Sequence, residues 1–322
     1  MRPLALFGLL ALLALFSCKP QPEETYRPTP YELPQPLFFP TANNIPADNP
    51  MTEEGVALGE MLFNEGRSCA MCHHKEHSFE MGPEGTLENL GTSHTMLPLI
   101  NLAWNTEGLG WEGQVKTLED MVYAAYTDPL EINADTTTVV RQLQQSDVYP
   151  ELFRKAFGTD KITFVNVEKA IAQYVRSLVF ADSKFDRYLR GEEQLSQDEL
   201  NGYLLFVTEK GADCFHCHGG GSNALFTTNL RYNNGLDAAI QGEFKAPTLR
   251  NIALTAPYMH DGRFTTLDEV IDFYSEGVQY SEQISPLMHH VMEGGVRLTP
   301  QEKQQLKAFL NTLTDTSLRG TK

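Results

Sequence analysis

Apolar residues recur at helical spacing in several segments of this chain, and most of these segments carry helix start signals. Residues 52–63 open with a threonine and two glutamates and continue as an apolar run, while residues 165–179 repeat apolar side chains every three or four positions. Four further segments begin with Ser or Thr followed by acidic residues or Gln, as capped helices do: residues 117–120, 196–199, 266–269 and 299–302. Strand-like alternation is scarce. The sequence therefore predicts a mainly α fold with long loops that contain Gly and Pro.

The N-terminus has the pattern of a secretory signal peptide over residues 1–17. After a positive residue comes an apolar run that is too short to span a bilayer. The run ends at Ser17 and Cys18, a small residue before a cysteine, which resembles the cleavage site of a bacterial lipoprotein. We predict a lipid anchor at Cys18 on the periplasmic side of a bacterial membrane. Lys19 rather than Asp follows, which favours the outer membrane; an ordinary signal peptide is the alternative.

Residues 18–50 contain nine prolines, a density that opposes helix and favours extended polyproline segments. We predict that they form a tether. The remaining residues, 51–322, suffice for about two domains at roughly 100–200 residues each. The net charge of −17 argues against a nucleic-acid-binding protein, which needs a basic face, and favours a cationic soluble partner.

Two short motifs suggest the chemistry of the protein. Each has two cysteines separated by two residues and followed directly by a histidine: Cys69, Cys72 and His73, and then Cys214, Cys217 and His218. This is the attachment signature of c-type haem, in which the thiols bond to the porphyrin and the histidine ligates the iron. Redox dithiols or a zinc site of four thiolates are the alternatives, but neither explains a histidine after each pair. We predict two covalently bound haem c groups, one in an N-terminal domain (residues 51–190) and one in a C-terminal domain (residues 191–322).

With these motifs in place, the chain resembles the bacterial dihaem cytochrome c peroxidases and their MauG-like relatives from about Gly55 to Leu313. The blocks that carry the resemblance are residues 68–73, 111–113, 131, 211–218, 246–251 and 255–262. The resemblance implies two cytochrome c-like haem domains. It also implies that peroxide reacts at the N-terminal haem and that the C-terminal haem handles electrons.

The same resemblance implies roles for individual residues. Trp111 corresponds to the tryptophan between the haems, where an indole can relay electrons; by itself it would be interpreted as a core residue. Glu131 corresponds to the glutamate of the peroxide pocket, where a carboxylate can take up and return a proton. Thr255 and Pro257 correspond to positions whose carbonyls bind calcium, an ion that prefers oxygen ligands. Tyr274 occupies the position of the sixth ligand of the C-terminal haem.

The chain departs from the peroxidase pattern at three positions. Gln114 replaces an arginine, and Met121 replaces a glutamine of the peroxide pocket, so Glu131 must act without that helper. Tyr274 replaces a methionine, as in MauG-like members. The competing interpretation is that Tyr274 lies in the core and a methionine ligates instead: Met259, Met288 or Met292. His94 is a candidate sixth ligand of the N-terminal haem, although a loop histidine is more often solvated.

Three functions from different classes remain open. A peroxidase would reduce hydrogen peroxide to water with electrons from a small donor protein, a cytochrome c or a cupredoxin. A MauG-like oxidase would use peroxide to oxidise an aromatic residue of a partner protein, which Tyr274 favours. A dihaem electron carrier would need no acid beside its iron, and Glu131 argues against it. Because one fold serves several activities, the site must decide between them; we predict the peroxidase.

Overall fold

The structure is a computed structural model that describes residues 26–315 and 317, apart from residues 67, 86–90, 92–93, 221–222 and 240–241. The predicted signal peptide and its lipid-anchored Cys18 lie outside the described residues. Within the described part of the chain, every helix is too short or too polar to cross a membrane.

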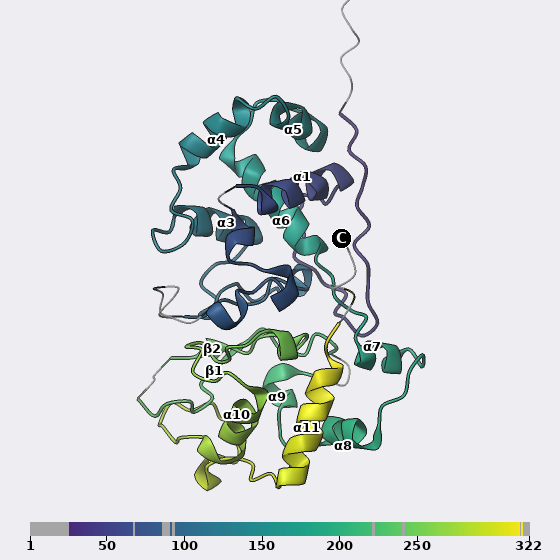
Figure 1. The fold of residues 1–322 in the computed structure, drawn as a ribbon, viewed down its shortest axis with the longest axis vertical. Helices are drawn as coiled ribbons and strands as arrows, with labels where there is room; N and C mark the ends of the chain where they lie inside the picture. Colours follow the sequence, from purple (N-terminus) through teal and green to yellow (C-terminus); the bar gives the residue numbers. More distant parts are fainter. Residues whose placement is uncertain are drawn as a thin grey trace, which may run out of the picture.

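Helices dominate the fold, which confirms the mainly α class. Figure 1 shows two lobes, with the earlier helices in the upper lobe and the later ones in the lower lobe. The upper helices are α1 (Glu53–Asn64), α3 (Leu118–Thr127), α4 (Thr136–Gln144), α5 (Tyr149–Phe157) and α6 (Phe164–Ser177). The lower helices are α7 (Lys184–Leu189), α8 (Gln197–Phe206), α9 (Phe215–His218), α10 (Leu267–Asp272) and α11 (Pro300–Thr312). Strands β1 (Arg231–Tyr232) and β2 (Phe244–Lys245) form a short antiparallel pair.

Short 3₁₀-helical turns and one π-helical turn lie between these elements. The 3₁₀ turns are η1 (Cys69–Met71), η2 (Lys75–His77), η3 (Gly82–Glu84), η4 (Leu102–Trp104), η5 (Ile252–Leu254) and η7 (Val291–Glu293). The turn η6 (Phe273–Gly277) is a π-helical turn that continues α10. A π-helical turn inside an α-helix is rare and frequently occurs at a functional site.

The predicted helix starts are confirmed. Each of the five predicted cap residues accepts a hydrogen bond from a backbone N–H in the first turn of α1, α3, α8, α10 or α11: Thr52, Thr117, Ser196, Thr266 and Thr299. These bonds satisfy N–H groups that have no partner within the helix. Helices α4, α5, α7 and α9 are additional to the predicted ones.

Helices α1 and α6 form the centre of the N-terminal core, whose buried apolar residues run from Leu58 to Phe180. The two helices approach closely at Gly59, where a Cβ would lie 2.0 Å from the carbonyl oxygen of Ala170, so only glycine fits there. The ring of Phe63 packs edge-on against Phe79, with centroids 5.9 Å apart. The first haem motif follows α1 directly and is therefore anchored to this core.

Helices α8 and α11 form the centre of the C-terminal core, whose buried apolar residues run from Phe185 to Leu313. Four fully buried phenylalanine rings pack together there: Phe185, Phe206, Phe226 and Phe309. Phe185 precedes the predicted domain boundary after residue 190 and nevertheless packs in this core. The boundary itself stays a prediction.

The described part of the proline-rich segment is packed against the body of the protein. The Asn44 side chain donates hydrogen bonds to the carbonyl oxygens of Leu102 (2.7 Å) and Asn105 (2.8 Å). The ring of Phe39 lies edge-on to Trp104, with centroids 4.9 Å apart, in an apolar cluster that also contains Ala224 and Leu225. The described residues of this segment therefore contact both halves of the chain and do not act as a free tether. Figure 1 shows the segment running beside the upper lobe and turning back where the two lobes meet.

A buried ion pair holds the C-terminal core to the linker that enters it. Both side chains are almost fully buried, with Arg250 1% and Asp186 6% exposed. The Arg250 guanidinium donates bidentate hydrogen bonds to the Asp186 carboxylate. It also donates hydrogen bonds to the carbonyl oxygens of Ala224 (2.6 Å) and Phe180 (3.1 Å). Burial opposes the charged form, but the hydrogen bonds and charge of Arg250 hold the pKa of Asp186 below its usual range.

We expect Asp186→Asn to lower the free energy of unfolding by about 3–5 kcal/mol, because it leaves the Arg250 charge buried without a counter-ion. Urea denaturation of the haem-loaded protein measures this change. The matched control is Asp182→Asn, which breaks an exposed pair with Arg190 and should cost less than about 1 kcal/mol. Equal losses in the two variants would contradict the prediction.

Candidate functional site

The first histidine of the haem motifs is oriented for metal ligation. The motif follows α1 and coils into η1, and Cys69 packs against the N-terminal core. The Nδ1 of His73 lies 2.6 Å from the carbonyl oxygen of Phe79. Because a carbonyl only accepts, Nδ1 carries the proton and Nε2 keeps a lone pair for iron. Burial lowers the pKa of His73, which favours the neutral ligand form.

The second motif repeats this arrangement in the C-terminal half. His218 ends the short helix α9, and its Nδ1 lies 3.0 Å from the carbonyl oxygen of Pro247. Burial lowers the pKa of His218 to about 4. Both motif histidines are therefore neutral, and each has one ring nitrogen held by backbone and the other available to a metal.

The cysteines of the two motifs fit haem attachment better than thiolate chemistry. All four are free. Burial raises the pKa of Cys69 to about 12 and that of Cys217 to about 12, which favours the thiol over the thiolate. Cys69 packs on the N-terminal core and Cys214 on the C-terminal core, which does not suit a single site of four thiolates. Each motif thus presents the donors that one haem c requires.

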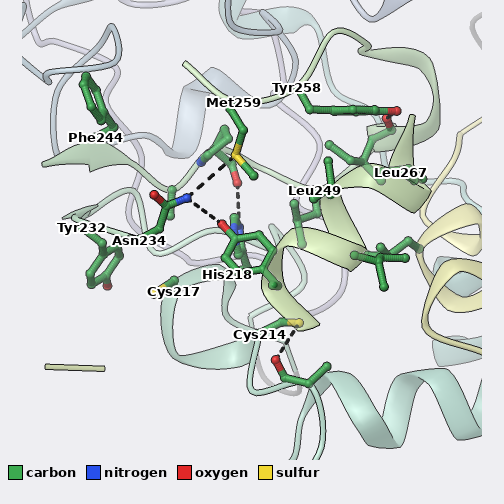
Figure 2. A pocket seen from close by; sticks show the side chains of 18 of the residues that line it. Cys214, Cys217, His218, Tyr232, Asn234, Phe244, Leu249, Tyr258, Met259 and Leu267 are labelled. Atoms are coloured by element: carbon green, nitrogen blue, oxygen red, sulfur yellow. Dashed lines mark hydrogen bonds between the residues drawn. The ribbon is translucent and has the colours of Figure 1, made fainter. Parts of the chain in front are cut away.

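A large apolar pocket lies over the second motif (Figure 2). Besides Cys214, Cys217 and His218, its lining is mostly aliphatic and aromatic, as a porphyrin face requires, and includes Leu249, Tyr258, Leu267, Ile271 and Leu310. Three of the candidate iron ligands also line it: Tyr274, Met259 and Met288. Met292 is 78% exposed and is not among the lining residues, so the structure does not support it as a ligand.

Tyr274 lies in the π-helical turn η6, so the break in α10 presents this side chain to the pocket. The amide of Asn234 donates a hydrogen bond of 3.0 Å to its hydroxyl oxygen and lies 3.8 Å from the sulfur of Met259; dashed lines in Figure 2 mark both contacts. Burial raises the pKa of Tyr274, while the Asn234 donor acts in the opposite direction and favours an anionic oxygen. Tyr274 and Met259 thus both lie next to the side-chain amide of Asn234.

Trp111 lies where the two halves of the chain meet. Its indole N–H donates to the carbonyl oxygen of Thr95 (2.8 Å), and its ring lies 6.3 Å from that of His260, centroid to centroid. Its backbone carbonyl accepts a hydrogen bond from Lys245 (2.8 Å), on β2. Trp111 also lines the pocket that contains His218. The indole therefore bridges the N-terminal loop and the C-terminal haem pocket.

Glu131 lies in the turn after α3, and the next residue, Ile132, packs on the same core as Cys69. The backbone N–H of Glu131 donates to the carbonyl oxygen of Asp128 (3.1 Å). Burial is the main cause of the raised pKa values of Cys69 and Cys72, and the charge of Glu131 adds to both. The Glu131 residue is exposed, but desolvation of its carboxylate and the charge of Asp128 raise the pKa of Glu131. Met121 packs against the N-terminal core.

The chain matches proteins of one family over most of its length. The family model of di-haem cytochrome c peroxidases matches residues 53–194. The methylamine utilization protein MauG of Methylophilus methylotrophus is 30% identical over 87% of this chain and 89% of its own length. The cytochrome c551 peroxidase of Nitrosomonas europaea is 30% identical over 84% of this chain and 83% of its own length. This chain belongs to the di-haem cytochrome c peroxidase and MauG family.

Solved structures agree with this assignment. A MauG-like protein associated with microbial copper homeostasis superposes with a TM-score of 0.80 and 33% identity, covering 90% of this chain and 97% of its own. The diheme peroxidase BthA from Burkholderia thailandensis has a TM-score of 0.68 at 19% identity over 83% of this chain and 87% of its own, and so shares the fold. Membership of the family makes the protein an oxidoreductase that carries two haem c groups.

His94 lies at the same junction as Trp111. Its ring packs near Phe244 (5.5 Å between centroids) and His260 (5.7 Å), both of the C-terminal half. Phe244 and His260 are themselves stacked, with centroids 3.8 Å apart. The structure thus places His94 in an aromatic cluster at the junction, and its ligation of the N-terminal haem stays a prediction.

Two residues of the pocket, Glu80 and Asn234, were not predicted from the sequence. Glu80 is buried, lines the same pocket as Thr255 and Pro257, and has one carboxylate oxygen without a hydrogen-bond partner. Burial raises the pKa of Glu80 to about 9. Asn234, the donor to Tyr274, is the other. Neither carries a spacing signal in the sequence, because their neighbours come from distant segments.

Proposed function

We propose that this protein reduces hydrogen peroxide to water at its N-terminal haem, with electrons that enter through the C-terminal haem. The observation that supports this proposal is that Ile132, the residue next to Glu131, packs on the same core as Cys69, and that the charge of Glu131 contributes to the raised pKa of Cys69 and of Cys72. A proton-transfer group next to the haem attachment point is what peroxide cleavage needs and what an electron carrier does not.

Cys69, Cys72 and His73 would hold the N-terminal haem, which would supply the redox chemistry of the reaction. The Glu131 carboxylate takes a proton from one peroxide oxygen and returns it to the other, which then leaves as water. Overall, two electrons and two protons convert one hydrogen peroxide into two waters. The raised pKa of Glu131 favours both proton uptake and proton return, because a general acid–base group works best when its pKa lies near the pH of the reaction.

Trp111 serves in this proposal as the relay between the two haems. Its indole contacts the Thr95 loop on one side and the His260 ring on the other, and it lines the pocket of His218. An aromatic ring in this position shortens the distance that each electron must cross.

A second function, oxidation of an aromatic residue of a partner protein, is favoured by Tyr274. We propose Tyr274 as the sixth ligand of the C-terminal haem, opposite His218. A phenolate ligand favours ferric iron, whereas a methionine favours ferrous iron and suits electron entry. A C-terminal haem with this ligand would share oxidising equivalents with the N-terminal haem through Trp111.

The electron donor in the first function is a small periplasmic protein, a cytochrome c or a cupredoxin. The net charge of −17 favours a donor with a cationic docking face. We also propose export to the periplasm and lipid anchoring at Cys18, preferably in the outer membrane, on the basis of the N-terminal sequence pattern.

A calcium ion between the two halves is part of the proposal. Thr255 and Pro257 would supply backbone carbonyls, and the unpaired carboxylate oxygen of Glu80 in the same pocket is an additional hard ligand. Calcium would hold the carboxylate of Glu80 in its charged form and tie the N-terminal segment to the C-terminal loop.

We expect the exported protein to carry two covalent haems. Its intact mass should exceed that of the processed polypeptide by two haem groups, and the pyridine haemochrome spectrum should show thioether-linked haem. Cys214→Ala with Cys217→Ala should remove one haem and leave the first motif loaded. Protein made with a haem maturation system that contains zinc and no haem would overturn this expectation.

Stopped-flow spectroscopy with hydrogen peroxide separates the two functions. The ferric and the half-reduced protein are mixed with peroxide in parallel. A haem spectrum that changes quickly only after half-reduction supports the peroxidase with electron entry at the C-terminal haem. A fast and stable change in the ferric protein supports the oxidase function instead, and no change in either form would reject both.

A further inference from the structure

Two histidines and one aspartate cluster beside the second haem motif, where the aspartate and one histidine also line the edge of the pocket over that motif, and none of the three has a role in the proposed peroxide reaction. Asp213 directly precedes Cys214, His216 lies between the two motif cysteines, and His289 comes from the segment before η7. One potential ligand atom from each of these three side chains lies within 4.8 Å of the other two.

The carboxylate of Asp213 lies between the two imidazoles. One of its oxygens is 2.7 Å from Nδ1 of His216, and the other is 3.3 Å from Nδ1 of His289. The Asp213 side chain is only 6% exposed, whereas the His289 side chain is 42% exposed. The cluster is therefore built on a buried acid and open to solvent at its outer histidine, so an ion can enter.

A second layer of contacts orients this cluster. A carboxylate oxygen of Glu209 lies 3.7 Å from Nε2 of His216, the ring nitrogen that faces away from Asp213. The backbone carbonyl of Glu209 lies 3.1 Å from Nε2 of His290 and so links the two loops. Histidines that ligate a metal through one nitrogen commonly present the other to a carboxylate in this way.

We propose that Asp213, His216 and His289 form a binding site for a divalent transition-metal ion, Zn²⁺ or Cu²⁺. Two imidazole nitrogens and one carboxylate oxygen are the donors that these ions take, and they leave a position open. Calcium and magnesium prefer sites made entirely of oxygen ligands. The bound ion would fasten the haem-attachment segment to the loop of His289.

This site does not depend on the proposed peroxide reaction, and its test does not use activity. The haem-loaded protein is freed of metals with a chelator and titrated with Zn²⁺ by calorimetry, with calcium present throughout. We expect one Zn²⁺ site in the wild type and an affinity at least about 10–100-fold weaker in His289→Gln, since even supporting residues of metal sites have effects of that size.

The matched control is His74→Gln, which removes an imidazole directly after the first haem motif and should leave Zn²⁺ binding unchanged. The haem content of each variant verifies that it is folded and matured. In a parallel Cu²⁺ titration, electron paramagnetic resonance should show coupling to two imidazole nitrogens in the wild type and to one in His289→Gln. Absence of a Zn²⁺ site in the wild type, or equal Zn²⁺ affinity in wild type and His289→Gln, would overturn the proposal.

Discussion

Replacing Glu131 by glutamine is expected to slow hydrogen peroxide turnover by about 10²–10⁴-fold, because positioned proton transfer contributes on that order to such reactions. The amide keeps the size of the side chain and its place in the turn after α3, but it cannot take up the proton. Both haem spectra should remain nearly unchanged, since Glu131 is not proposed to ligate either iron. Steady-state turnover and rapid mixing with peroxide measure the loss.

The control for this variant is Glu60→Gln, an exposed glutamate on α1 of the same half of the chain. It should keep the turnover of the wild type. A Glu131→Gln protein within about threefold of wild type, well below the expected range, would show that the proton moves by another route.

The pH dependence of the peroxide reaction provides an independent check on Glu131. The reaction needs the carboxylate as the base, so the rate should fall as the pH falls through the pKa of this group. Desolvation of the exposed Glu131 carboxylate and the charge of Asp128 raise that pKa, so the acid limb should lie above the usual glutamate range. This limb should be missing from the profile of Glu131→Gln. An unchanged limb in the variant would assign it to another group.

Replacing Tyr274 by methionine is expected to raise the midpoint potential of the C-terminal haem by on the order of 0.1 V or more, within the roughly 0.8 V range that axial ligands span. As a ligand, the Tyr274 phenolate would stabilise ferric iron, and the Asn234 amide, which donates a hydrogen bond of 3.0 Å to this oxygen, would support its charge. The variant should also gain the weak near-infrared band of iron bound by histidine and methionine. Spectroelectrochemistry and near-infrared absorption measure the two changes.

The matched control is Tyr232→Met, because Tyr232 lines the same pocket and binds Thr228 through its hydroxyl. It should leave both the potential and the near-infrared spectrum unchanged. If the wild-type ferric protein already shows the near-infrared band, Tyr274 is not the ligand, and Met259→Leu should then abolish the band. In that case the electron-entry peroxidase becomes the stronger of the two functions.

The helix N-caps and the haem motifs of this protein could be predicted from the sequence. The N-caps at Thr52 and Thr299 act within one helical turn, so the residues that determine them are neighbours in the chain. The two haem motifs are equally local, since five consecutive residues supply both thiols and the proximal imidazole. The mainly α class and the two cofactors follow from these short-range patterns.

Contacts between residues far apart in the sequence could not be predicted from the sequence. The π-helical turn at Tyr274 follows a helix whose start was predicted correctly, but the turn itself was not predicted. Tyr274 lines the pocket that contains His218, to which separate segments of the chain contribute. The packing of Phe39 onto Trp104 and Arg250 shows why the proline-rich segment is more than a tether. Proline content predicts an extended backbone but not what that backbone contacts.

The sequence by itself therefore determined that this chain is helical and carries two haem groups, because both properties depend on residues a few positions apart. Only the tertiary structure decided which side chains share an environment: Tyr274 with Asn234 and Met259, Glu80 with Thr255, and Asp213 with His289. These groups come from segments that are separate in the sequence, and tertiary packing brings them together. Their chemistry depends on burial and on distances that no local pattern contains.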